Sequence, residues 1–87
     1  MRERTEMEFP STFPVKVMGR QGSDLARIAR DIVERHAGRL DESRISERPS
    51  AAGNFLALTF VIEAQSRQQL DAIYRELTAC ELVLMAL

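Results

Sequence analysis

Several residue types are scarce in this sequence, and each scarcity excludes a class of protein. The single cysteine, Cys80, leaves no intramolecular disulfide and fits a reducing compartment. No apolar run reaches the ~18 residues of a membrane helix, and the charged start MRERTEME leads into no apolar signal region. The sequence therefore predicts a cytoplasmic protein without a membrane segment.

Excess positive charge is missing as well. The 12 basic residues, of which Lys16 is the one lysine, are balanced by 13 acidic residues, so the net charge is −1. Nucleic-acid-binding proteins of this size usually carry a clear positive excess. The chain also has one histidine and one cysteine, which do not form a cluster of three or four metal ligands in the sequence. We therefore expect no metal and no cofactor, and we do not expect nucleic acid as the partner.

The residues that are present suit an ordinary globular domain, because 45% of the 87 residues are hydrophobic. Residues 1–8 alternate in charge and predict a loose N-terminal arm, and residues 9–87 predict a single domain. Apolar periodicity and capping signals predict these elements in order: a strand at 12–19, a helix at about 24–37 with Ser23 as its N-cap, a polar edge strand at 44–50, a strand at 55–64, a helix from the capping box of Ser66 and Gln69 to about Thr78, and a strand at 82–87.

The order βαββαβ is typical of the ferredoxin-like sandwich, an α+β fold. Its four-stranded antiparallel sheet carries both helices on one face, with the first and third strands at the centre. Side-chain alternation turns Ala57, Thr59 and Val61 of the third strand to the face without helices. In the last strand it predicts Leu82, Leu84 and Ala86 on that same face, and Val83, Met85 and Leu87 on the helix side.

An apolar outer face is unusual, because the solvated face of an antiparallel sheet is ordinarily polar. A contiguous exposed apolar patch usually marks a partner surface. We therefore expect a homodimer, or another protein bound at this face or at the edge of the last strand. The interface residues would be Ala57, Thr59, Val61, Leu82 and Leu84. The alternative is that the arm, residues 1–8, folds across the face.

Motifs spread over most of the chain resemble a known family. They are FP-x-x-F-x-x-KVMG at 9–19, IVERHA at 32–37, PSAAGNF at 49–55, QLDAIYREL at 69–77 and the ending LVLMAL. Together they resemble the YbeD-like family of small bacterial proteins. The resemblance implies a ferredoxin-like fold similar to the ACT domains that regulate metabolic enzymes. Some members are encoded near lipoate-transfer enzymes, which implies a regulatory link to lipoate metabolism.

The turn at 50–54 could cradle an anion or simply join two strands. A phosphate-binding loop normally leads into a helix, whose N-terminus supplies the field. This turn leads into a strand, so the sequence favours a hairpin in which Gly53 or Asn54 adopts a positive φ. The chain also departs from the resembling family at Ala52, where members often carry a basic residue, so this turn lacks that charge.

A second turn, at 19–24, is the candidate effector site. ACT-like domains bind small effectors beside the equivalent glycine-containing turn, and the resemblance carries this role to Gly19, Gly22, Ser23 and Asp24. Gly22 would let the backbone approach a ligand, and free N–H groups at the helix start could hold a carboxylate. The alternative is an ordinary turn, since Asp24 would repel an anion and Gly19 stands where ACT domains commonly carry an acidic residue.

The sequence contains no convincing catalytic group. His36 and Cys80 could form a nucleophile pair, but no third orienting group suggests itself. We therefore expect a non-enzymatic regulatory or adaptor module that binds a partner protein or a small metabolite. The alternative is an RNA-binding ferredoxin-like domain, although the third strand lacks the stacking aromatic pattern of such domains, and Phe55 is interpreted as a packing residue. A hydrolase or transferase that uses Cys80 or His36 ranks last.

Overall fold

The computed structural model describes residues 8–87, so the predicted arm lies outside the described residues except for Glu8. The elements are β1 (Ser11–Arg20), α1 (Leu25–Ala37), a one-turn 3-10 helix (Glu42–Arg44), β2 (Ile45–Pro49), β3 (Phe55–Ala64), α2 (Arg67–Ala79) and β4 (Val83–Ala86). The predicted strands and helices are all present, and a short 3-10 helix that was not predicted precedes β2. No helix in this part of the chain is long and apolar enough to cross a membrane.

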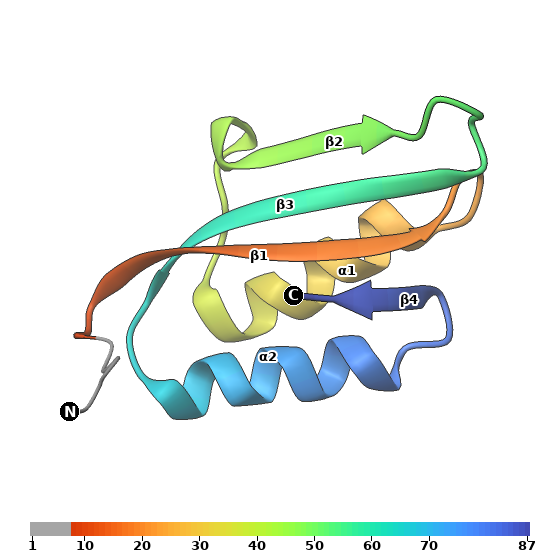
Figure 1. The fold of residues 1–87 in the computed structure, drawn as a ribbon. Coiled ribbons are helices and arrows are strands. Elements are labelled where there is room, and N and C mark those ends of the chain that lie inside the picture. Colours follow the sequence, from red (N-terminus) through yellow and green to blue (C-terminus); the bar gives the residue numbers. More distant parts are fainter. Residues whose placement is uncertain (1–7) are drawn as a thin grey trace, which may run out of the picture.

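The four strands form one antiparallel sheet in the order β2-β3-β1-β4. Both helices lie on the same side of this sheet (Figure 1). The predicted α+β ferredoxin-like fold is therefore confirmed, including β1 and β3 as the central strands. β1 and β3 are each ten residues long and pair over their whole length, from Ser11 with Ala64 to Arg20 with Phe55.

The hydrophobic core fills the space between the sheet and the two helices. Every fully buried residue of the described chain is apolar. The largest of these side chains are Phe60, Leu25, Leu58, Ile62, Ile73, Leu77, Val15 and Val33. They come from alternate positions of β1 and β3 and from one stripe of each helix, as the two periodicities require. Removal of this apolar surface from water is the main force that holds the helices on the sheet.

The two helices begin differently. Ser66 caps α2 as predicted, because its hydroxyl oxygen accepts from the Gln69 N–H at 3.1 Å. The prediction of Ser23 as the N-cap of α1 is wrong by one residue. Asp24 occupies the cap position without a capping hydrogen bond from its side chain, which instead pairs with Arg27 at 3.2 Å. The Ser23 hydroxyl accepts from the Leu25 N–H at 3.2 Å, one position before the cap.

A β-bulge interrupts the pairing of β1 with β4. Met18 pairs with Met85 and Gly19 pairs with Val83, so Leu84 has no partner on β1. One extra residue reverses the alternation of side chains on the strand that carries it.

The bulge corrects the orientations predicted for the last strand. Met85 and Leu87 were expected on the helix side, but they line a hollow on the face without helices. Leu82 and Ala86 were expected on that face, but they pack against the core. The period-two rule gave the wrong face because it assumed an uninterrupted strand. Val83 packs against the core as predicted.

Gly19 is the residue that lets the chain pack closely at the bulge. A Cβ atom at this position would overlap the backbone oxygen of Leu82 and would lie 2.5 Å from Cδ2 of Leu25. The end of β1 can therefore approach both α1 and the start of β4 because Gly19 has no side chain.

Gly19→Ala should lower the free energy of unfolding by about 1–3 kcal/mol, the usual cost of an overpacked core. The added methyl group meets backbone at Leu82, which cannot move as a flexible side chain can. Urea unfolding followed by circular dichroism would measure the change. Ser46→Ala, at an exposed strand position, is the control and should alter stability by less than about 0.5 kcal/mol. A Gly19→Ala variant as stable as the parent would contradict this packing argument.

A polar network fixes the chain after α1. Glu34 Oε2 accepts from the Leu40 N–H at 2.8 Å and from Arg30 Nε at 3.1 Å. Arg30 also donates to Glu42 at 2.7 Å and to the Leu40 carbonyl at 3.0 Å. The hydrogen bond from Leu40, together with the Arg30 guanidinium, holds the pKa of Glu34 below its ordinary value despite partial burial. The loop between α1 and β2 is thereby tied to the helix.

This network predicts a loss of stability in acid. Because the pKa of Glu34 is lower in the folded state, its ionised form stabilises the fold above the ordinary glutamate pKa of about 4.3. That contribution is lost as the pH falls through the folded-state pKa. Glu34→Gln should therefore cost about 1 kcal/mol at neutral pH and should flatten the pH dependence in acid.

Urea unfolding of both proteins across the acidic range would check this expectation. The control is Glu47→Gln, since Glu47 is exposed and forms no ion pair with residues 8–87. It should keep the pH profile of the parent. Parallel profiles for the parent and Glu34→Gln would show that Glu34 does not anchor the loop.

Candidate functional site

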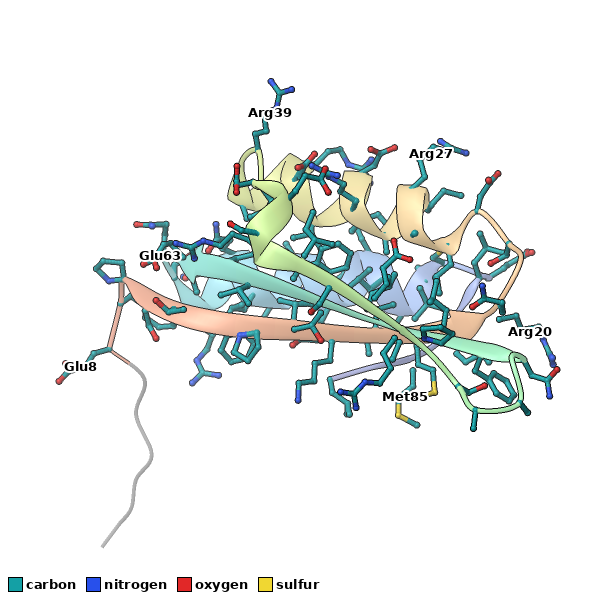
Figure 2. All side chains as sticks on the ribbon, turned by 90° about the horizontal axis from the view of Figure 1, so that it is seen from above. Glu8, Arg20, Arg27, Arg39, Glu63 and Met85 are labelled. Carbon is teal, nitrogen blue, oxygen red and sulfur yellow. The ribbon has the colours of Figure 1, made fainter. Side chains whose placement is uncertain are left out.

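The sheet face turned away from the helices is the candidate functional site, and we call it the open face. Figure 2 shows Met85 on this side of the sheet, with Arg27 and Arg39 projecting from the opposite side of the molecule. By strand register the open face carries Thr12, Pro14, Lys16, Met18 and Arg20 of β1, Phe55, Ala57, Thr59, Val61 and Glu63 of β3, Ser46 and Arg48 of β2, and Met85 and Leu87 at the end of the chain.

Large apolar side chains gather at one end of the open face. We call Met18, Phe55, Ala57, Met85 and Leu87 the apolar patch. The exposed fractions are 39% for Met18, 37% for Phe55, 51% for Met85 and 67% for Leu87, whereas Val15, Val17, Leu58 and Phe60 on the helix side are at most 2% exposed. This end of the face therefore exposes apolar surface to water.

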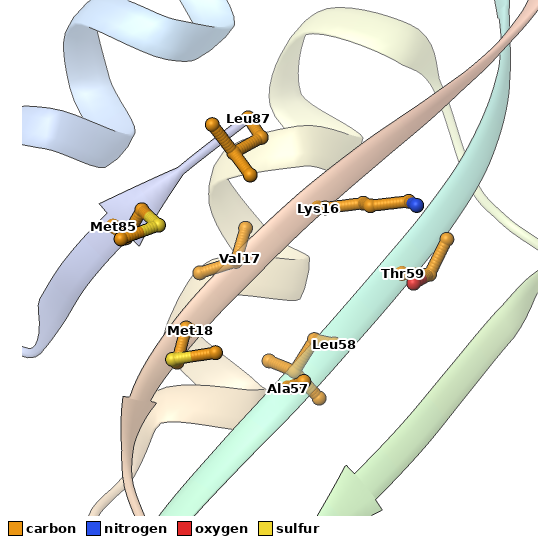
Figure 3. Close-up of a pocket in the computed structure, with 8 residues that line it drawn as sticks. All are labelled: Lys16, Val17, Met18, Ala57, Leu58, Thr59, Met85 and Leu87. Atoms are coloured by element: carbon orange, nitrogen blue, oxygen red, sulfur yellow. The ribbon is translucent and has the colours of Figure 1, made fainter.

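The patch is hollowed rather than flat. Met18, Ala57, Met85 and Leu87 line a hollow of about 130 Å³, with Lys16 among its other lining residues (Figure 3). A second hollow, of about 170 Å³, lies between Met18, Ala57 and Phe55 and extends to Pro49. Apolar side chains of a partner could enter both hollows.

Three basic side chains surround the apolar patch, and we call Lys16, Arg20 and Arg48 the basic rim. The Arg20 guanidinium lies 5.9 Å from the centroid of the Phe55 ring, within the range of a cation–π contact. Lys16 and Arg48 line a hollow of about 420 Å³, together with Glu47. None of the three forms an ion pair with any residue from 8 to 87.

Most of the predicted interface residues lie on the open face. Ala57, Thr59 and Val61 are half-buried there, and Leu84 is exposed at the bulge. Leu82 does not belong to the surface, since it packs against the core. Whether these residues bind a partner stays a prediction.

Sequence reasoning missed the strongest members of the patch. Met18 could have been included, because it alternates with the inward Val17 along β1. Met85 and Leu87 could not, since the bulge alone decides their face. Phe55 was interpreted as a packing residue, yet it is partly exposed beneath Arg20.

The turn at 19–24, predicted to hold an effector, is occupied by contacts of its own. Gly19 packs against Leu25 and Leu82, as described above. The Ser23 hydroxyl donates to the Arg20 carbonyl at 2.9 Å and accepts from the first turn of α1. Gly22 adopts a φ of +87°, and the Asp24 carboxylate lies beside Arg27. These contacts explain all four residues structurally, and effector binding there stays a prediction.

The turn at 50–54 is a hairpin whose polar groups satisfy one another. Ser50 Oγ accepts from the N–H groups of Asn54 and Phe55, both at 3.2 Å. Gly53 has a φ of +75°, and its N–H bonds to the Ser50 carbonyl at 3.0 Å. The Asn54 carbonyl accepts from the Gln21 N–H at 2.9 Å, which joins this hairpin to the turn at 19–24. The hairpin interpretation is confirmed.

His36 joins the two helices. Its buried Nε2 lies 3.3 Å from Glu76 Oε2, at ion-pair distance but without hydrogen-bond alignment. Arg35 donates to the same carboxylate, and this hydrogen bond, with His36, holds the pKa of Glu76 below its ordinary value. Gln69 Nε2 donates to the His36 carbonyl at 2.9 Å. Both of these contacts, through the His36 side chain and through its carbonyl, therefore link α1 to α2.

The second candidate catalytic residue also has a structural setting. Cys80 is half-buried at the C-terminal end of α2 and packs against the core. Within residues 8–87 no three His, Cys, Asp or Glu side chains come together as a metal site would require.

Comparison with known proteins identifies the family. Residues 4–87 match the family described as "Protein of unknown function (DUF493)". A UPF0250 protein of Ralstonia nicotianae is 43% identical over 81 residues, which cover 93% of this chain and 84% of the relative. A UPF0250 protein of Janthinobacterium is 44% identical over 77 residues, with 88% and 85% covered, and one of Leptothrix cholodnii is 41% identical over 86 residues, with 99% and 94% covered. The chain therefore belongs to the DUF493 family, to which the bacterial UPF0250 proteins and the expected YbeD-like proteins correspond.

Proposed function

We propose that this chain is a non-enzymatic regulatory or adaptor module that acts by holding another protein on its open face. The observation that carries the proposal is the apolar patch, where Met18, Met85 and Leu87 remain exposed on a face that no element of residues 8–87 covers. Burial of such surface contributes roughly 25 cal/mol per Å². An exposed apolar patch bordered by polar residues is the usual mark of a protein-binding surface.

The shape of the open face favours binding of a protein over small-molecule chemistry. Its two apolar hollows measure about 130 and 170 Å³, whereas pockets for small ligands are usually apolar and measure about 300–1,000 Å³. The larger hollow, of about 420 Å³, is lined mainly by polar and charged side chains. The candidate catalytic residues are also far better explained by packing. His36 links the helices through Glu76 and Gln69, and Cys80 packs at the end of α2.

A small effector could regulate this binding, as in the ACT domains that the chain resembles. The turn at 19–24 is hydrogen-bonded to the hairpin that leads into Phe55, through Gln21 and Asn54. A ligand that prefers one arrangement of the turn would thereby shift the population of arrangements of the patch. The resemblance makes lipoate metabolism the first pathway in which to seek the partner. A homodimer is the simplest alternative occupant of the face.

The proposal predicts site-specific cross-linking in the native host. A photo-crosslinking amino acid in place of Met85 should capture a discrete protein, because Met85 stands in the apolar patch. The matched control replaces Arg39, which projects from the helix side (Figure 2) and should capture none.

A second substitution, Met18→Asp, should abolish the cross-link formed from position 85, since it places a charge in the same hollow. Protein gels and mass spectrometry would give the readout. Equal cross-linking from positions 85 and 39, or a product indifferent to Met18→Asp, would argue against the open face as the binding site.

RNA binding is the second candidate, and the basic rim favours it. Related folds stack bases on aromatic side chains of the same sheet face. Here the ring of Phe55 is covered by the Arg20 guanidinium. The middle of β3 carries Ala57 and Thr59, which offer no aromatic ring for a base to stack on. We therefore expect no binding of a fluorescent single-stranded RNA at physiological salt. Anisotropy that rises with protein, falls with added salt and disappears in Arg48→Glu would support the RNA candidate instead.

A further inference from the structure

We propose that the partner's contribution to the open face is an acidic amphipathic helix, which lies across the sheet and turns the two-layer domain into a helix–sheet–helix sandwich. This inference rests on the proposed function and adds the chemistry of the segment that docks. Two properties of the open face carry it: the distribution of its charges and its dimensions. The basic rim also makes a second copy of the chain a poor occupant.

The cations around the apolar patch lack the carboxylate partners that several arginines of the helix side have. On the helix side, Arg27, Arg30 and Arg35 each pair with a carboxylate. On the open face the three cations of the basic rim have no such partner among residues 8–87. Although the chain has a net charge of −1, the surroundings of the apolar patch are therefore positive.

One carboxylate lies close to the basic rim, since Glu47 lines the hollow of about 420 Å³ together with Lys16 and Arg48. Glu63, the acidic residue that strand register places on the open face itself, is far from the patch. Glu63 lies at the opposite end of β3, where it accepts from the Thr12 hydroxyl at 2.7 Å and lies 4.0 Å from Arg44. An acidic partner would meet cations around the patch and would meet this carboxylate only if it extended over the whole face. Charge complementarity of this kind selects partners and speeds their encounter, while the apolar contacts supply most of the affinity.

The dimensions of the face suit a helix. From Phe55 to Val61, β3 spans about 20 Å, which is the length of a helix of about 13 residues. The same sheet already packs two helices of 13 residues on its other side. A helix satisfies its own backbone hydrogen bonds, so it needs only side chains from the surface, and side chains are what the centre of a sheet face offers.

A second copy of the chain suits the face poorly. In a two-fold symmetric dimer the same surface meets itself, so Lys16, Arg20 and Arg48 of both copies would be brought into one interface. Like charges brought together at an interface oppose association. The basic rim therefore disfavours face-to-face self-association.

Selection from a phage library of random 16-residue peptides on the folded protein would test this inference. Enriched peptides should carry apolar residues at positions i, i+3, i+4 and i+7, with Asp and Glu in excess over Lys and Arg. In ¹⁵N NMR spectra they should shift the amide signals around Met18, Ala57 and Met85. A synthetic version with Lys in place of each acidic residue should bind the parent protein at least tenfold more weakly.

Charge reversal on the protein gives the matched comparison. Arg48→Glu and Lys16→Glu should each weaken binding of the acidic peptide at least threefold, and together they should restore binding of the Lys-containing version. Arg39→Glu makes the same change in charge on the helix side (Figure 2) and should alter binding by less than twofold. If Lys16→Glu fails to fold, Arg48→Glu and the Lys-containing peptide still decide the question.

The outcomes separate this inference from the proposed function. Some enriched peptides could map to the open face, lack an acidic excess and bind the charge-reversal variants as tightly as the parent. Such peptides would overturn the inference of an acidic helix and leave the proposal of protein binding intact. Failure to enrich any peptide, or enrichment of peptides that map to α1 and α2, would overturn both. Concentration-dependent dimers that Met85→Glu dissociates, or RNA binding lost in Arg48→Glu, would assign the face to a different occupant.

Discussion

The open face depends on the close approach of β1 to β4 at Gly19. Because this residue has no side chain, the backbone oxygen of Leu82 and the side chain of Leu25 can both lie against it. The bulge beside it then shifts the register of β4 by one residue. That shift places Val83 and Ala86 toward the core and leaves Met85 and Leu87 toward solvent. The close approach at Gly19 thus accompanies the bulge that adds Met85 and Leu87 to the apolar patch.

The two faces of the domain are stabilised in different ways. On the helix side, arginines and carboxylates form a network that joins α1 to the 3-10 helix and to α2. Isolated exposed pairs contribute little, usually below about 1 kcal/mol, but the hydrogen bond from the Leu40 N–H to Glu34 gives this network a fixed geometry. Around the apolar patch, Lys16, Arg20 and Arg48 form no ion pair with residues 8–87. Such cations contribute little to folding, and the role that we propose for them is recognition.

The fold could be predicted from the sequence because its signals are local. Alternation in β1 and β3, the apolar stripes of both helices and the cap at Ser66 each depend on residues within a few positions of one another. The position of Met18 on the open face follows from the same alternation. The positions of Met85 and Leu87 do not, because the bulge arises from contacts between segments distant in sequence. The cap of α1 was misplaced for a related reason, since Asp24 turns to Arg27 instead of capping the helix.

The last residue of the chain is held in place from two sides. The backbone oxygen of Leu87 accepts from the Lys16 N–H at 2.9 Å and from the Tyr74 hydroxyl, and the Leu87 N–H donates to the Lys16 carbonyl at 2.7 Å. Its side chain lines the hollow beside Met85. Any polypeptide fused after Leu87, such as an affinity tag, would therefore emerge at the border of the apolar patch and obstruct it.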